Sequence, residues 1–345
     1  MRGILTAMAV AVAPAAAIAA EPAKPLFASN DPIRLTISGP ISAIANKAEQ
    51  SEAPRPATLA LTGTAESHPI RLSARGITRR KSETCPFPPL RVEFAAPPPA
   101  ASLFHGQRRL KLVTHCREAA GFQQHVLLEY AAYRLFNHLT PASYRVRLAQ
   151  IDYVEPSGKL KASRVGFFIE DTDDVARRNG VREAKMPDRI SNAQLVARDS
   201  ARVALFQYMI GNLDWSIRAG PSGQGCCHNS RLIAPAAATA NLVPIPYDFD
   251  FSGLVDAPYA VPPDGLPVKS VRKRYYRGYC RFNAEAPAVA AEFRAQRSAL
   301  LATLSQIPQI EIRTVRKASS FLDGFFADIA SDQAVTANLL KDCAR

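Results

Sequence analysis

Alternating apolar and polar positions dominate the first half of the chain. This alternation is typical of strands that bury one face. We expect strands at residues 33–37, 58–61, 70–75, 90–94 and 110–113. A further strand pair is expected at 144–154 and 163–169, joined by a turn around Gly158. The first half is therefore expected to form a sheet.

Apolar positions at helical spacing appear once within this region and then dominate the rest of the chain. The first such segment is 121–138, and Pro141 follows it. After an acidic run at 171–174, helices are expected at 192–210, 286–307, 311–327 and 332–343. The pattern predicts a β-rich part over residues 21–171 and a helical part over residues 172–345.

The first twenty residues have the pattern of a signal peptide. Arg2 supplies a positive charge, residues 4–18 are mostly apolar, and Ala17-Ile18-Ala19 is a small-residue cleavage site. The apolar run is short for a membrane anchor and contains Pro14. No later stretch is long and uncharged enough to span a bilayer. We expect a periplasmic or secreted protein after removal of residues 1–20.

Six cysteines in an exported chain predict disulfides. Cys85 and Cys116 are expected to form one bond within the first half. A bond between the adjacent Cys226 and Cys227 would close a strained eight-membered ring. We therefore expect each of these two to pair with one of the later cysteines, which are Cys280 and Cys343. A zinc site built from Cys226, Cys227, Cys280 and His228 is the alternative.

The charge balance points to anionic partners. Lys and Arg number 43 against 30 Asp and Glu, which gives a formal net charge of +13. Such an excess favours nucleic acid, phosphorylated ligands or a lipid surface. The chain has no helix-turn-helix, RNA-binding or zinc-finger spacing, and export argues against nucleic acid as the partner.

The densest candidate chemistry lies between residues 211 and 253. Asp214 follows a long expected helix, Asn229 comes fifteen residues later, and Asp248 and Asp250 follow an apolar strand at 242–245. In phosphoryl transfer one Asp orients or deprotonates the attacking hydroxyl, while an Asn and a second Asp hold Mg²⁺. Caps and turns are the alternative for each residue alone. The apolar neighbours favour burial, and buried carboxylates need a cation or several donors.

These motifs resemble an atypical protein-kinase-like family. Gly211-Asn212-x-Asp214-Trp215, the following Asn and an Asp-Phe-Asp after a strand are similar to the catalytic and metal loops of the spore-coat-protein-H (CotH) kinase-like family, and more loosely to HipA-type kinases. The segment 75–80 and the basic strand after it resemble the family's Arg-Gly-Asn-Ser hairpin. The likeness covers most of residues 70–255, including an acid at Glu170 that matches the family's hinge.

The resemblance implies an α+β, bilobal protein-kinase-like fold. An antiparallel-sheet N-lobe with one helix would precede a mostly helical C-lobe, with the site between them. Asp214 would be the catalytic-loop residue. The implied metal ligands are Asn229, Asp248 and, assisting them, Asp250.

The resemblance also implies a phosphate-binding set in the first half. Lys111 would pair with the phosphates and Glu129 would be its partner on the helix. Arg75 and Arg79 would reach phosphates from the hairpin. For both arginines the alternative is a solvated basic face, which we favour for Arg79 over Arg75.

Two functions of different classes follow from these expectations. The first is a metal-dependent phosphotransferase, using Mg²⁺ or Mn²⁺ with ATP or another nucleotide, that modifies a protein or an envelope molecule. The second is a non-catalytic, pseudokinase-like protein that binds an anionic envelope component. The second stays open because Gly76 and Gly106 stand alone, so that no Gly-rich phosphate loop is evident.

Overall fold

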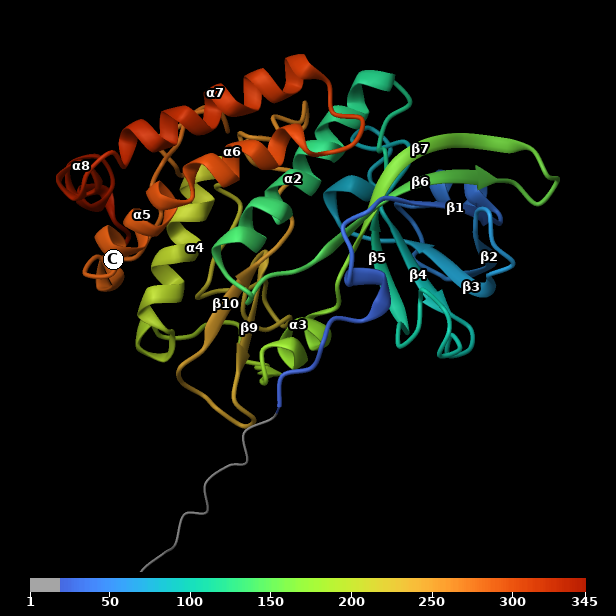
Figure 1. Cartoon of the computed structure of the whole chain (residues 1–345), viewed down its shortest axis with the longest axis horizontal. Helices are drawn as coiled ribbons and strands as arrows, with labels where there is room; N and C mark the ends of the chain where they lie inside the picture. Colours follow the sequence, from blue (N-terminus) through green and yellow to red (C-terminus); the bar gives the residue numbers. More distant parts are fainter. Residues whose placement is uncertain (1–18) are drawn as a thin grey trace, which may run out of the picture.

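The strand-rich half of the protein closes into a barrel (Figure 1). The computed structural model describes residues 19–345, so that most of the expected signal peptide lies outside the described residues. Neighbouring strands follow the order β1-β2-β3-β4-β5-β7-β6. The barrel strands are β1 (Ile33–Ser38), β2 (Arg55–Leu61), β3 (Ser67–Ala74), β4 (Leu90–Phe94), β5 (Arg109–Val113), β6 (Val146–Val154) and β7 (Leu160–Ile169).

The closed barrel overturns the expected bilobal protein-kinase-like fold. An antiparallel N-lobe sheet was expected, but β1 and β6 pair in parallel, with Leu35 opposite Ile151, and this pairing joins the two edges. The sheet is therefore mixed and closed. A three-stranded sheet, in the order β10-β9-β8, stands apart from it. Alternation along a strand shows which side chains are buried and does not show which edges pair, and for this reason the prediction failed.

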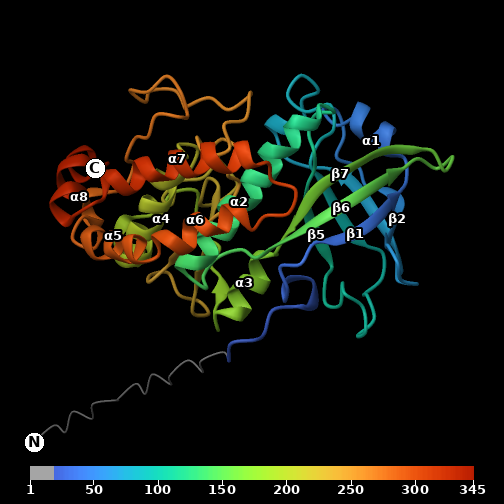
Figure 2. The ribbon, with the colours of Figure 1, turned by 45° about the horizontal axis from the view of Figure 1, so that its top comes forward.

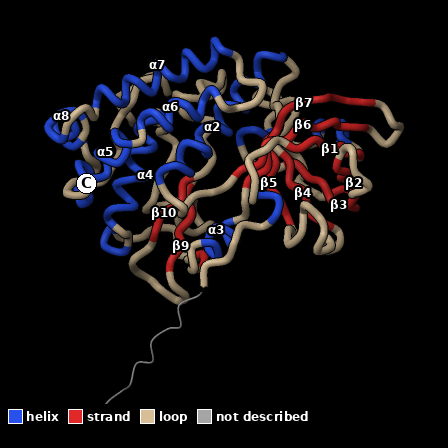
Figure 3. Tube along the Cα trace, viewed as in Figure 1, coloured by secondary structure: helices blue, strands red, loops and turns tan. Residues whose placement is uncertain are grey.

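Eight α-helices and the small sheet make up the rest of the described chain (Figures 1 and 3). Helix α2 follows the barrel strand β5 and leads into β6. The helices are α1 (Ile41–Asn46), α2 (Gln123–Leu139), α3 (Thr172–Arg178), α4 (Ala197–Ile210), α5 (Ala286–Ala295), α6 (Arg297–Ser305), α7 (Ile312–Asp328) and α8 (Asp332–Asn338). The small sheet has β8 (Arg182–Glu183), β9 (Ser230–Ala234) and β10 (Val243–Pro246).

Helix α2 lies between the barrel and the other helices (Figures 1 and 2). It packs against β6 and β7 on one side and against α4 and α6 on the other. Its side chains are therefore buried on most of its surface, and Tyr130 and Tyr133 are each 1% exposed. Both tyrosine rings meet Phe167 of β7 edge to face. Any polar group on the middle of α2 thus lies at the junction between barrel and helices.

Most of the expected helices and strands are present. Differences arise where one long apolar pattern covers two helices, and where an element is too short to show a pattern. The helix expected at 286–307 is two helices, α5 and α6, separated at Gln296. The helix expected from 192 begins at Ala197, after a short 3-10 turn. Helices α1 and α3 and strands β8 and β9 were not expected, because segments of two to seven residues show too few repeats of either period.

Three disulfides are present, and one of them was predicted. Cys85 is bonded to Cys116 as expected. Cys226 and Cys227 are bonded to each other across a cis peptide bond, so the pairing expected for them is wrong. Cys280 is bonded to Cys343, because the C-terminal segment pairs with the chain at Cys280 through a hydrogen bond from its N–H to the Ala344 carbonyl, at 2.9 Å. With these cysteines oxidised, no thiolate is left for the alternative zinc site.

The helices were also compared with the length and hydropathy that a membrane span requires. Within residues 19–345, none combines a sufficient length with a sufficiently apolar sequence to cross a bilayer. The longest, α2 and α7, have 17 residues each and carry polar or charged side chains.

Candidate functional site

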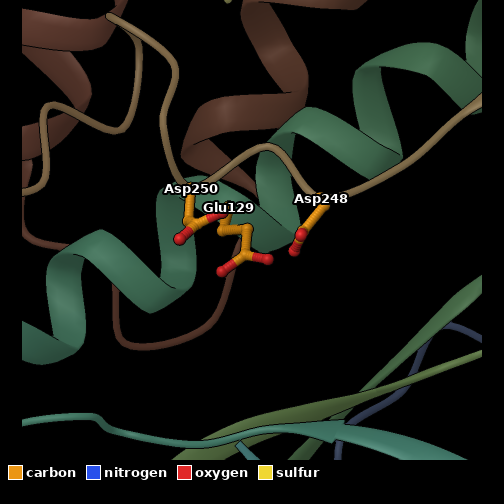
Figure 4. A group of neighbouring side chains, drawn as sticks. All are labelled: Glu129, Asp248 and Asp250. Atoms are coloured by element: carbon orange, nitrogen blue, oxygen red, sulfur yellow. The ribbon is translucent and has the colours of Figure 1, made fainter. Parts of the chain in front are cut away.

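Three carboxylates meet at the junction between α2 and the turn that follows β10 (Figure 4). Glu129 comes from α2, and Asp248 and Asp250 come from the turn. One oxygen of each lies within 4.8 Å of the others. Glu129 and Asp250 are 2% and 3% exposed, whereas a third of the Asp248 side chain is exposed. We call these three residues the acidic triad. It is buried on one side and reachable from solvent at Asp248.

Arg79 is bound to all three members of the acidic triad. Its Nη1 donates to Glu129 Oε2 at 2.9 Å and its Nη2 donates to Asp248 Oδ1 at 2.8 Å. Its Nε lies 3.2 Å from Asp250 Oδ2. The Arg79 side chain is 9% exposed. When all groups are ionised, three negative charges face one positive charge, so the cluster carries an excess of negative charge.

Burial makes this excess unfavourable, and the pKa values reflect it. Burial raises the pKa of Asp250 to about 8, against the opposing effect of Arg79. Burial likewise raises the pKa of Glu129. Burial by itself would lower the pKa of Arg79, but Asp250 and Glu129 hold it well above its ordinary value. An additional positive charge next to the acidic triad would therefore stabilise the ionised carboxylates.

The Asp214 loop begins where α4 ends. Gly211 terminates α4 in the left-handed conformation, at φ +64°. A Cβ there would lie 2.9 Å from Phe321 and 3.1 Å from the Val271 carbonyl, so glycine also permits the close approach. The Asn212 side chain accepts a hydrogen bond from the Asp214 N–H at 3.0 Å, and buried Trp215 donates to the Asn212 carbonyl at 3.1 Å. These contacts hold the backbone of the Asp214 loop in place.

Asp214 is held by the two residues that precede β9. His228 Nε2 lies 2.7 Å from Asp214 Oδ1, and Asn229 Nδ2 donates to Asp214 Oδ2 at 3.0 Å. The hydrogen bond with Asp214 raises the pKa of His228. Since the Tyr247 N–H donates to the Asn229 carbonyl at 3.0 Å, Asn229 lies beside the residue that precedes Asp248. The Asp214 loop and the acidic triad are thus at the same end of the small sheet.

Basic side chains face this region from the barrel. Lys111 Nζ, on β5, lies 4.8 Å from the centre of the Tyr247 ring. Burial, together with the charges of Arg75 and Arg231, lowers the pKa of Lys111 to about 8. Arg91 is directly opposite Lys111 in the β4–β5 register. Like charges in that arrangement are unfavourable unless an anion lies between them. A cavity of about 440 Å³ is lined by Arg91, Lys111 and Arg231 and also by the carboxylates of Glu170, Asp171 and Glu183.

The structure brings together most of the residues predicted from the sequence. Asp214 contacts Asn229, and Asp248 and Asp250 share the triad. The expected ion pair between Lys111 and Glu129 is wrong, because among the described residues Glu129 forms its ion pair with Arg79.

The expectation that Arg79 lies on a solvated face is also wrong, since this side chain is buried among carboxylates. Arg75 is half-buried, and burial lowers its pKa. The charge of Asp248 opposes this shift, which indicates that Arg75 lies near the triad. Sequence reasoning gave Arg231 and Tyr259 no role, and it considered His228 as a neighbour of Asn229 or a metal ligand and missed its contact with Asp214. Tyr259 donates to Asp250 at 3.0 Å.

Comparisons with known proteins assign no family to the chain. No protein-family model matches it, and no curated protein matches it. The resemblance of the Asp214 and Asp248 segments to the CotH family therefore stays a prediction, and the function is argued below from the residues of the site.

Proposed function

We propose that this protein transfers a phosphoryl group from a nucleoside triphosphate to a hydroxyl group, with Mg²⁺ or Mn²⁺ as cofactor. The acceptor would belong to a protein or an envelope molecule. The observation that supports this is the acidic triad next to an Asp214 carboxylate oriented by His228 and Asn229, with Lys111 and Arg75 on the facing barrel. Carboxylates for a hard cation, cations for phosphates and one oriented carboxylate are the groups that phosphoryl transfer uses.

The charge of the acidic triad fits a divalent cation. With all three carboxylates ionised, the triad and the guanidinium sum to two negative charges, which a divalent cation would neutralise. Because the pKa of Asp250 is about 8, binding of the cation near neutral pH would release its proton. Mg²⁺ prefers oxygen ligands and is usually held by one or two carboxylates plus phosphate oxygens. Asp248 is the most exposed member of the triad, so it is the residue best placed to share a cation with a phosphate. A bound cation would neutralise the charge that develops on the transferred group.

In the proposed step the acceptor oxygen attacks the terminal phosphorus. Asp214 accepts the proton of the attacking hydroxyl, and the bond from phosphorus to the bridging oxygen breaks. The nucleoside diphosphate leaves with the electron pair of that bond. His228 and Asn229 keep Asp214 in one orientation, and Lys111 and Arg75 neutralise phosphate charge. The protein therefore contributes position and electrostatics.

Arg79 supports a second candidate function. A guanidinium that already neutralises all three carboxylates gives the site a stable state without a cation. A protein that binds an anionic envelope component through Lys111, Arg91 and Arg231, without catalysis, would need no divalent cation. In this alternative Arg79 has only a structural role.

Export is part of the proposal. The first twenty residues have the pattern of a signal peptide, and the three disulfides support an oxidising compartment. We propose that the protein acts in the periplasm or outside the cell. The nucleoside triphosphate that donates the phosphoryl group has to be supplied to that compartment.

Nucleotide binding and transfer test the proposal together. Purified protein is titrated with ATP in the presence of Mg²⁺, Mn²⁺ or a chelator, and then incubated with labelled ATP and a cell-envelope extract. We expect cation-dependent binding and transfer of label to the extract or to the protein itself. Asp248→Asn is expected to abolish both. Asp264→Asn, which changes an exposed carboxylate outside the acidic triad, is expected to leave both unchanged.

The outcomes separate the two functions. Binding of ATP that is equally strong with chelator, without transfer, would support the non-catalytic candidate. Absence of ATP binding under every cation condition would contradict the phosphotransferase.

Lys111 gives the proposed site a pH dependence. Its pKa of about 8 means that the ammonium loses its proton as the pH rises through 8. A phosphate group is attracted to the charged form, so its affinity is expected to be constant below pH 7 and to fall up to tenfold per pH unit above about pH 8. Calorimetric titration with ATP between pH 6.5 and about pH 9.5 measures this. Lys111→Arg, which stays charged, is expected to remove the decline; an unchanged decline in that variant would contradict the assignment.

A further inference from the structure

A second basic pocket lies at the end of α2, away from the acidic triad. Its volume is about 500 Å³. It is formed by the last turns of α2, the loop from α2 to β6, the segment after Phe27, and α3. Within the described residues no Asp or Glu lines it. The polar side chains that line it include Asn30, Arg134, Asn137, His138, Arg145 and Arg178.

Two arginines of this pocket lack a carboxylate partner among the described residues. Arg134 Nη1 donates to the Tyr130 hydroxyl at 3.2 Å, and Arg145 Nη1 donates to the Phe27 carbonyl at 3.1 Å. Both side chains are half-buried. Arg178 differs, because its Nε and Nη2 bind Glu170 at 2.8 and 2.9 Å. The pair formed by Arg178 and Glu170 is neutral, so Arg134 and Arg145 leave the pocket with two uncompensated positive charges.

Holding two guanidinium groups partly out of water without a counter-charge is unfavourable. Burial and the charge of Arg178 lower the pKa of Arg145 against the opposing effect of Glu170, so the charged form of Arg145 is not fully compensated. An anion in the pocket would relieve it. A phosphate monoester carries nearly two negative charges at neutral pH, and the planar guanidinium matches its oxygens. A carboxylate would neutralise only one of the two.

We propose that the pocket at the end of α2 is a binding site for a small phosphate-bearing ligand, held by Arg134 and Arg145. The site is separate from the acidic triad and requires no divalent cation. Asn137 adds a second recognition group. Its Nδ2 donates to Ser143 Oγ and to the Tyr144 carbonyl at 3.0 and 2.9 Å, which fixes the amide at the lining of the pocket.

Calorimetry and hydrogen exchange test this proposal on the full chain in low salt with a chelator. Inorganic pyrophosphate stands for a free anion and glycerol 3-phosphate for a lipid headgroup. We expect at least one of them to bind, and the stronger of the two identifies the source. The double variant Arg134→Gln/Arg145→Gln is expected to lower that affinity about a hundredfold, since each of the two charge-assisted contacts contributes about 1.4 kcal/mol, or about tenfold. Arg313→Gln, an exposed arginine on α7, is the matched control.

Hydrogen exchange of the unmodified protein locates the ligand. Slower exchange in peptides that cover residues 137–145 is the expected result. Binding that the double variant leaves unchanged, or protection confined to residues 211–253, would overturn the proposal. Because exchange is measured on the unmodified protein, the proposal stays testable even if the double variant does not fold.

Discussion

Replacing Arg79 with methionine is expected to destabilise the protein by about 3–5 kcal/mol in the presence of a chelator. The variant keeps the length of the side chain and removes the only cation that binds all three carboxylates of the acidic triad among the described residues. Glu129 and Asp250, which are both almost fully buried, would then lack a counter-charge. Chemical denaturation monitored by circular dichroism measures the change.

A divalent cation is expected to restore much of that loss. A ligand that binds only the folded state stabilises it by about 2.7 kcal/mol at a concentration one hundred times its Kd. In the wild-type protein the cation has to share the carboxylates with Arg79, so we expect a smaller effect of Mg²⁺ or Mn²⁺ there than in Arg79→Met.

Arg297→Met is the control for this experiment, because Arg297 forms an exposed ion pair with Asp323 at 2.8 Å. Such pairs contribute at most about 1 kcal/mol, and no cation dependence is expected. If Mg²⁺ and Mn²⁺ leave the stability of Arg79→Met unchanged, the acidic triad is not a cation site, and the non-catalytic candidate is favoured.

Local structure in the barrel follows directly from the sequence. Ile33, Leu35 and Ile37 are buried inside the barrel, while the residues between them face outward or lie at intermediate depth. This arrangement gives the alternation from which the strand was predicted. Closure of the barrel was not predictable in the same way. It depends on parallel hydrogen bonds between β1 and β6, which lie more than one hundred residues apart and leave no local pattern.

One part of the candidate site was likewise predictable from the local sequence, and another part was not. Asp248 and Asp250 were singled out because apolar neighbours indicated burial, and they are close together. The Arg79 contact with Glu129 spans fifty residues and joins a 3-10 turn to the middle of a helix. The charged residues around Arg79 in the sequence suggested a solvated face. Tertiary packing of α2 against the turn after β10 determines its burial, and sequence spacing does not encode that packing.

Replacing Asp214 with asparagine is expected to lower the rate of phosphoryl transfer by about 10²–10⁴-fold while the affinity for ATP and cation stays within about twofold. The amide has the shape of the carboxylate and keeps the loop held by Asn212 and Trp215 in place. It lacks the basicity to accept the proton of the attacking hydroxyl. Single-turnover measurements with labelled ATP separate the rate of transfer from binding.

His228 provides a readout that does not depend on activity. Its pKa is raised by its hydrogen bond to Asp214, so Asp214→Asn is expected to lower that pKa toward the ordinary value for histidine, as followed by NMR titration. His228→Gln removes the ring and keeps the Asp214 carboxylate. If Asp214 accepts the proton, this second variant retains most of the transfer rate. Equal losses in both variants would mean that the Asp214–His228 pair acts as a unit, in which the histidine, and not the carboxylate alone, is needed for proton transfer.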